Sequence, residues 1–162
     1  MLIHRTDSSC EDGMLQWSVT ENLSTGLTFC MIRTKFHIVV NGNPWYITIF
    51  LPITRYHVSE IMDALYSIGI SEDNYKTALD NLTSGRINNG ITYSSIEYRH
   101  SISVWARCEN KIEYFGLLIH ELHHLSVQIA SMNGLDLEGE EVCYINEYIA
   151  KYLYNLCKPL IT

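Results

Sequence analysis

The sequence lacks the features that mark membrane proteins and disulfide-rich secreted proteins. No uninterrupted apolar run approaches the roughly eighteen residues of a membrane span, so we expect none. The five cysteines are odd in number, are scattered and form no CxxC pair, which argues against a disulfide framework and a cysteine zinc site. The first residues turn polar at once instead of forming the apolar run of a signal peptide, so we expect a cytoplasmic protein without classical secretion.

Basic residues are also scarce. Eleven Lys and Arg stand against eighteen Asp and Glu, which gives a formal net charge of -7. This charge repels nucleic-acid backbones and anionic lipid surfaces, so we expect neither nucleic acid nor a membrane among the partners. A length of 162 residues with 47% hydrophobic residues is typical of one globular domain. We therefore predict a single domain over residues 1–162, of which residues 1–24 carry little pattern.

The first half of the chain contains the pattern of a β-hairpin. Two runs rich in β-branched and aromatic residues, 27–40 and 45–51, flank the Asn-Gly-Asn-Pro turn at residues 41–44. Further short strands are predicted at residues 91–94 and 101–105, the second from its alternation of polar and apolar residues.

Helical spacing of apolar residues predicts four helices. They are expected over residues 58–68, from the N-cap Ser71 to about residue 85, over residues 110–130 and over residues 138–156. Pro159 is expected to prevent the last helix from continuing, because proline lacks the N–H of a helix interior. The sequence therefore predicts an α+β fold with a small antiparallel or mixed sheet.

An HExxH sequence lies inside the third predicted helix. Residues four apart lie one above the other on a helix, so His120 and His124 can direct two imidazoles at one metal ion. Glu121 then lies beside a water molecule that such an ion would bind. Neutral imidazole and carboxylate are ligands that suit zinc, and a catalytic zinc site keeps one position open for water.

The third ligand is expected from the last helix. The HExxH segment, followed after fifteen residues by Glu-Glu-Val-Cys-Tyr at positions 140–144, resembles the gluzincin arrangement, in which a later helix supplies a Glu ligand. The stretch from Asn89 to Ile145 resembles small zincin-like metallopeptidases encoded by bacteriophages and prophages of gut bacteria. This resemblance covers about the C-terminal half of the chain.

The resemblance implies a zinc-dependent peptidase that hydrolyses peptide bonds of a peptide or protein substrate. It assigns the Zn²⁺ ligands to His120, His124 and Glu140 and the role of general base to Glu121. It also offers a role for the strand at residues 101–105 as an edge strand that holds the extended substrate by main-chain hydrogen bonds. The alternative for this strand is an ordinary core strand without a substrate role.

The resemblance places Glu140 first as third ligand, whereas helix geometry keeps Glu141 and then Glu147 open as alternatives. Glu140 lies almost opposite the apolar stripe of its helix, whereas Glu141 lies nearer the edge of that stripe. At about 1.5 Å per residue, an HExxH helix that continues to residue 133 leaves Glu140 below His124 and brings Glu147 closer to its level. Glu140 can therefore be the ligand only if the HExxH helix ends early or the two helices cross steeply.

A different class of function fits the same motif. The chain is short for a peptidase with a substrate-shaping second lobe, so a zincin fold could serve as a structural or assembly component of a phage particle. The metal site would then be vestigial or stabilising, and the partners would be other phage structural proteins or copies of the chain itself. The expected location is the host cytoplasm or the virion.

Overall fold

Strands and helices alternate along the part of the chain that the computed structural model describes, which is residues 15–21, 28–53, 57–84, 90–106, 108 and 110–161. The strands are β1 (Leu15–Glu21), β2 (Thr28–Val40), β3 (Asn43–Ile53), β4 (Gly90–Ser95) and β5 (His100–Ala106). The helices are α1 (Val58–Ser67), α2 (Glu72–Thr83), α3 (Lys111–Met132) and α4 (Glu140–Ile161).

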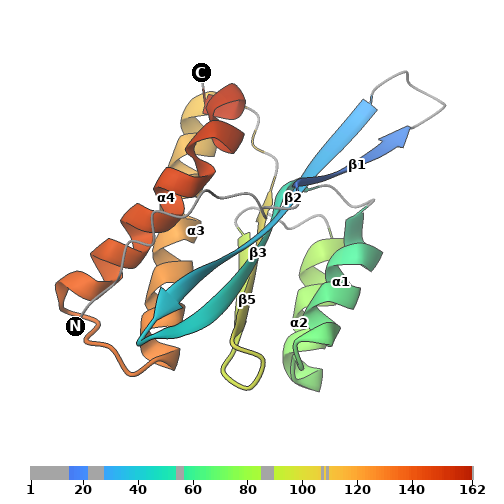
Figure 1. Cartoon of the computed structure of the whole chain (residues 1–162). Coiled ribbons are helices and arrows are strands. Elements are labelled where there is room, and N and C mark those ends of the chain that lie inside the picture. The colour runs from blue at the N-terminus through green and yellow to red at the C-terminus, as the bar shows by residue number, and fades with distance from the viewer. Residues whose placement is uncertain are drawn as a thin grey trace.

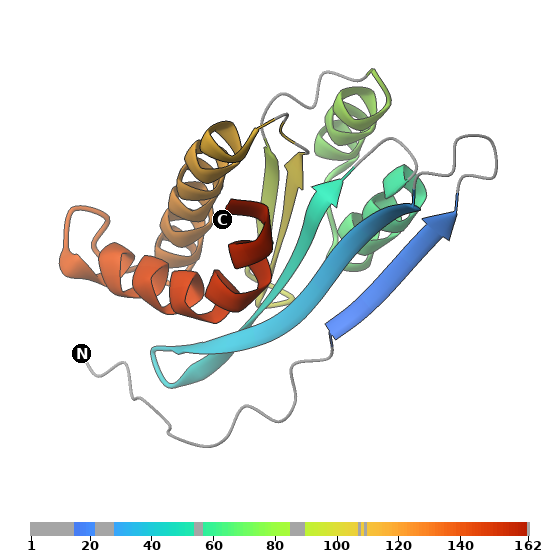
Figure 2. The ribbon, with the colours of Figure 1, turned by 90° about the horizontal axis from the view of Figure 1, so that it is seen from above.

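The strands form one mixed sheet in the order β1-β2-β3-β5-β4. β3 and β5 are parallel, and the other neighbouring strands are antiparallel. Helices α1 and α2 cover one face of the sheet, and α3 and α4 cover the other (Figures 1 and 2). The α+β prediction with a mixed sheet is confirmed, and in this sheet β4 is an edge strand.

The predicted hairpin joins β2 to β3. Asn41 and Gly42 have φ angles of 52° and 76°, and Val40 pairs with Asn43 across the turn. Positive φ at both central residues is the geometry of a type I′ turn, which Asn-Gly sequences favour. The turn thereby sets the register of the two longest strands.

Alternating side chains of the sheet build a core on each face. Trp45, Ile47 and Ile49 of β3 are buried with apolar residues of α3 and α4. Phe50 of the same strand is buried in a second cluster with apolar residues of α1 and α2. Both faces are therefore packed, and the open hydrogen-bonding groups of the sheet lie along its edges.

Two elements differ from the sequence-based expectation. β1 pairs with β2 although residues 1–24 showed little pattern, because its main-chain hydrogen bonds depend on the partner strand rather than on periodicity. The prediction that Pro159 ends the last helix was wrong, since α4 continues to Ile161. A proline removes one helical hydrogen bond and bends a helix without always ending it.

None of the described helices combines the length and apolar character needed to cross a membrane.

Candidate metal centre and the adjacent groove

Helix α3 positions the HExxH residues. Its N-terminus is capped by the side chain of Asn110, which accepts hydrogen bonds from the N–H groups of Ile112 and Glu113. Leu122 and Ile129 lie in the core shared with α4 and the sheet. The cap and the buried side thus fix how the remaining sides of α3 are presented.

The structure brings His120 and His124 together. Both side chains are exposed, and their Nε2 atoms lie 3.0 Å apart. Two nitrogens at about 2.0–2.1 Å from a tetrahedral zinc ion are about 3.3 Å apart. The pair is therefore arranged as two converging metal ligands. His123 is also exposed, and its neighbouring position places it about 100° around the helix from His124.

Glu121 points in a different direction from the histidine pair. Its side chain is only 2% exposed, and Oε1 accepts a hydrogen bond of 2.8 Å from the N–H of Gly90, the first residue of β4. The position has no space for a side chain on Gly90, because an added Cβ would lie 2.4 Å from Glu121 Cδ. The proposed general base is thus held at the edge of the sheet.

Glu140 is not brought to the histidine pair. It is the exposed first residue of α4, and its Oε2 accepts a hydrogen bond of 2.5 Å from the hydroxyl of Tyr144. This hydrogen bond, together with the negative charge of Glu140, raises the pKa of Tyr144. Of the other two candidates, Glu141 is partly exposed, and Glu147 accepts a hydrogen bond from Lys151.

The packing of α4 explains this separation. Tyr152 of α4 stacks on Phe36 of β2, whereas α3 contacts β4 through Glu121, so α3 lies between α4 and the β4 edge. Leu122 lies in the core shared with α4, and His120 and His124 are each about 160° around α3 from Leu122. The pair consequently does not lie between the two helices, and α3 does not end early, since it runs to Met132. Among the described residues, no third His, Cys, Asp or Glu completes a metal-binding group.

The strand at residues 101–105 is not an edge strand. It belongs to β5, which pairs with β3 on one side and with β4 on the other. Alternation within a strand indicates a half-buried face but does not specify how many neighbours the strand has. The edge-strand alternative was therefore wrong, the core-strand alternative agrees with the structure, and β4 holds the edge position next to α3.

Gln128 is a site residue that sequence reasoning missed. It lies seven residues after Glu121, on the same side of α3, and its Nε2 donates to the carbonyl of Thr92 at 3.1 Å. Its Oε1 accepts a hydrogen bond of 2.9 Å from the hydroxyl of Ser94. The seven-residue spacing of Glu121 and Gln128 indicates that both side chains lie on one side of the helix. Only the position of β4 in the structure shows what that side contacts.

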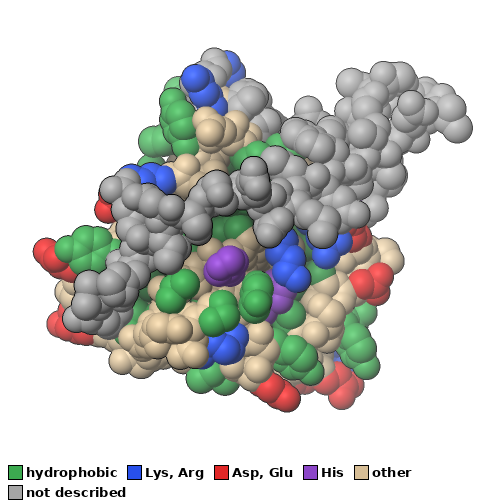
Figure 3. Space-filling model, viewed as in Figure 1, with side chains coloured by type: hydrophobic (Ala, Val, Ile, Leu, Met, Phe, Trp, Pro, Cys, Tyr) green, Lys and Arg blue, Asp and Glu red, His purple; other side chains and the backbone are tan. Residues whose placement is uncertain are grey.

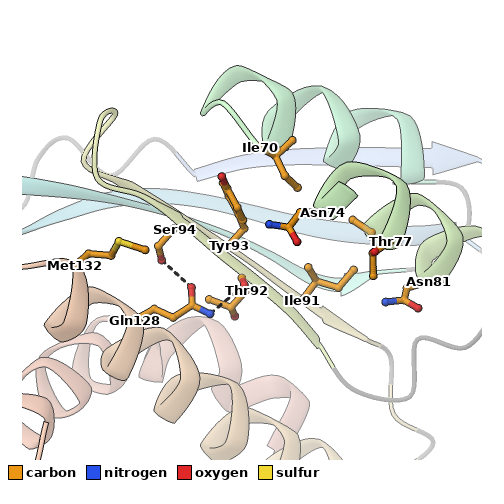
Figure 4. Close-up of a pocket in the computed structure, with 11 residues that line it drawn as sticks. Ile70, Asn74, Thr77, Asn81, Ile91, Thr92, Tyr93, Ser94, Gln128 and Met132 are labelled. Carbon is orange, nitrogen blue, oxygen red and sulfur yellow. Dashed lines mark hydrogen bonds between the residues drawn. The ribbon is translucent and has the colours of Figure 1, made fainter. Parts of the chain in front are cut away.

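A groove of about 350 Å³ lies along this edge. Its floor is β4, one wall is formed by Gln128 and Met132 of α3, and the other wall is formed by α2 (Figure 4). The β4 residues that line the groove are Ile91 to Ser94, so the groove begins one residue beyond Gly90, which Glu121 contacts, and Glu121 itself does not line it.

Comparison with known proteins identifies no relative: no family model, no curated protein and no solved structure matches this chain.

Proposed function

We propose that the protein is a zinc-dependent metallopeptidase of the zincin type, a hydrolase that cleaves peptide bonds. The main support is one arrangement on α3, in which two exposed imidazoles converge to 3.0 Å beside a buried Glu121 that contacts an edge strand. Imidazole pairs at this spacing suit zinc, and the carboxylate of Glu121, on the same helix next to His120, is the candidate proton acceptor.

His120 and His124 would hold the ion. The predicted third ligand, Glu140 or else Glu141 or Glu147, lies on α4 away from the pair in this structure, so its coordination would require α4 to shift relative to α3. When bound, zinc activates water for attack and polarises the scissile carbonyl. Glu121 accepts a proton from the attacking water and returns it to the nitrogen of the departing amine. To do so, its carboxylate must exchange the N–H of Gly90 for the water, or use the oxygen that Gly90 does not bind.

The substrate chain is assigned to β4 in place of β5. In an antiparallel pair, alternate residues direct their main-chain groups away from the partner strand. The outward N–H of Gly90 and the outward carbonyl of Thr92 bind α3 side chains, which places Gly90, Thr92 and Ser94 on the outward side. An extended peptide can hydrogen-bond to the groups of this edge that α3 leaves open.

Zinc content and peptide cleavage test the assignment separately. Wild type should bind one zinc per chain, and His120→Ala should lose it. Glu121→Gln should keep zinc and lose hydrolysis of a peptide library by at least about a hundredfold, because it removes the proton acceptor. Unchanged zinc in His120→Ala would refute the ligand assignment, and full activity of Glu121→Gln would refute the role of Glu121.

Single Ala variants at Glu140, Glu141 and Glu147 identify the third ligand. Replacement of the true ligand should weaken zinc affinity strongly, whereas the other two variants serve as matched carboxylate controls on the same helix.

A second candidate function is a structural or assembly component of a phage particle. Its support is an apolar exposed strip on α3, where Ile112, Phe115 and Ile119 are 85%, 50% and 52% exposed. Exposed apolar patches are typical of protein interaction sites. Self-association in sedimentation experiments that is lost in Phe115→Ser, together with no cleavage of any peptide, would favour this candidate.

A further inference from the structure

The α2 wall of the groove presents a row of uncharged polar side chains. Asn74, Thr77 and Asn81 occupy one side of α2 and face β4 across the groove (Figure 4). Thr77 donates its hydroxyl hydrogen bond to the carbonyl of Asp73 within the helix. The side-chain amides of Asn74 and Asn81 are exposed and have no hydrogen-bond partner among the described residues.

The opposite wall is already occupied with internal contacts. Both ends of the Gln128 amide are used, one on Ser94 and one on Thr92. A ligand in the groove therefore finds its free side-chain amides on α2 rather than on α3. Helix α3 thus holds β4 in place, whereas α2 offers the side-chain amides that can bind a ligand.

The lining of the groove carries no charge. All eleven residues that line it are uncharged, and they combine amide and hydroxyl groups with apolar side chains such as Ile91 and Tyr93. A charged ligand group would lose part of its hydration here without gaining an opposite charge. An apolar ligand group would cover the amides of Asn74 and Asn81 without replacing their hydrogen bonds to water.

We propose that Asn74 and Asn81 are specificity-determining residues, which select extended polypeptides with uncharged, hydrogen-bonding side chains on the side that faces α2. Ser, Thr, Asn and Gln are the residues of this class. Only the identity of the occupant as a polypeptide rests on the proposed function; the selection itself follows from the lining.

Binding without cleavage tests this inference independently of catalysis. The probes are N-acetylated, C-amidated eight-residue peptides in which Gly alternates with Asn, Lys, Glu or Val, titrated into the ¹⁵N-labelled Glu121→Gln protein. The Asn peptide should shift the side-chain amide signals of Asn74 and Asn81 and the main-chain signals of Thr92 and Ser94. Its Kd should be at least fivefold lower than that of each other peptide. Equal Kd values, or shifts confined to other regions, would overturn the proposal.

A charge change at the wall gives a second, matched measurement. Asn74→Asp and Asn81→Asp keep the size of the side chain and add a negative charge, so each should lower the Kd of the Lys peptide at least fivefold. Asn155→Asp adds the same charge at an exposed position of α4, outside the groove, and should leave the Kd unchanged. An equal effect of all three variants would show that net charge, not the wall, decides binding.

A neutral saccharide is the remaining occupant to test. If tri-N-acetylchitotriose shifted the signals of Asn74 and Asn81 and no peptide did, the occupant class would be wrong. Binding of the Asn peptide with no peptidase activity in wild type would instead refute the proposed function and leave the wall assignment intact.

Discussion

Gly90 and Glu121 share a small volume at the start of β4, where the N–H of Gly90 reaches the carboxylate at 2.8 Å. The contact requires a residue without a side chain, because a Cβ at this position would also lie 2.7 Å from the carbonyl oxygen of Val104. One glycine thus determines where the proposed general base can rest.

Gly90→Ala should destabilise the protein by about 1–3 kcal/mol, since either Glu121 or the strand must move to admit the methyl group. Urea unfolding monitored by circular dichroism measures this change.

Gly116→Ala is a suitable control on α3. A Cβ at Gly116 meets no atom within 4 Å, so this variant should gain about 0.5–1 kcal/mol from the better helix propensity of alanine. Wild-type stability of Gly90→Ala would contradict the close approach of Gly90 and Glu121.

At the scale of the element, α3 combines three tasks on separate sides. One side packs in the core through Leu122 and Ile129, one binds β4 through Glu121 and Gln128, and one presents His120 to solvent. A helix with three occupied sides depends on its correct start, because rotation by one residue would move every side by about 100°.

Asn110→Ala should cost about 1 kcal/mol, because two N–H groups at the start of α3 lose their acceptor. Thermal and urea unfolding of the variant provide the measurement. Asn110→Asp keeps an acceptor at the N-cap and should remain close to wild type, so equal losses in the two variants would argue against the cap.

At the scale of the whole molecule, the negative net charge is not spread evenly. Figure 3 shows histidine side chains next to Lys and Arg side chains in the middle of one face, with Asp and Glu side chains around its rim. His100 lies in such a cationic setting: burial, then the charges of Lys35 and Arg33, lower its pKa from 6.5 to about 4. Its Nε2 is within 2.9 Å of the hydroxyl of Thr48.

This shift predicts a pH dependence of stability. Between pH 6.5 and about 4 the unfolded chain binds a proton at His100 that the folded chain does not. The stability that neutral His100 contributes to the folded state is therefore complete above pH 6.5 and declines as the pH falls. The free energy of unfolding of wild type, minus that of His100→Asn, should therefore be constant from pH 7 to 8 and fall from pH 6.5 to 4. A difference independent of pH would contradict the neutral state of His100.

The local features of this protein follow from residues that are close together in the chain. The β2–β3 turn, the start of α3 near residue 110 and the four-residue spacing of His120 and His124 each depend on neighbours within a few positions, so their chemistry was readable from the chain. The same holds for the α+β class, which followed from hydrophobic periodicity.

Contacts between distant parts of the chain set which strand lies at the edge of the sheet and which side of α3 faces that strand. β5 and β4 are both short strands, and their order depends on pairing with β3, a contact across about fifty residues of sequence. The role of Gln128, the resting place of Glu121 and the polar wall of α2 all follow from that order. Nonlocal pairing leaves no periodic signal in the sequence, and for this reason the helix with the motif was predictable while the groove beside it was not.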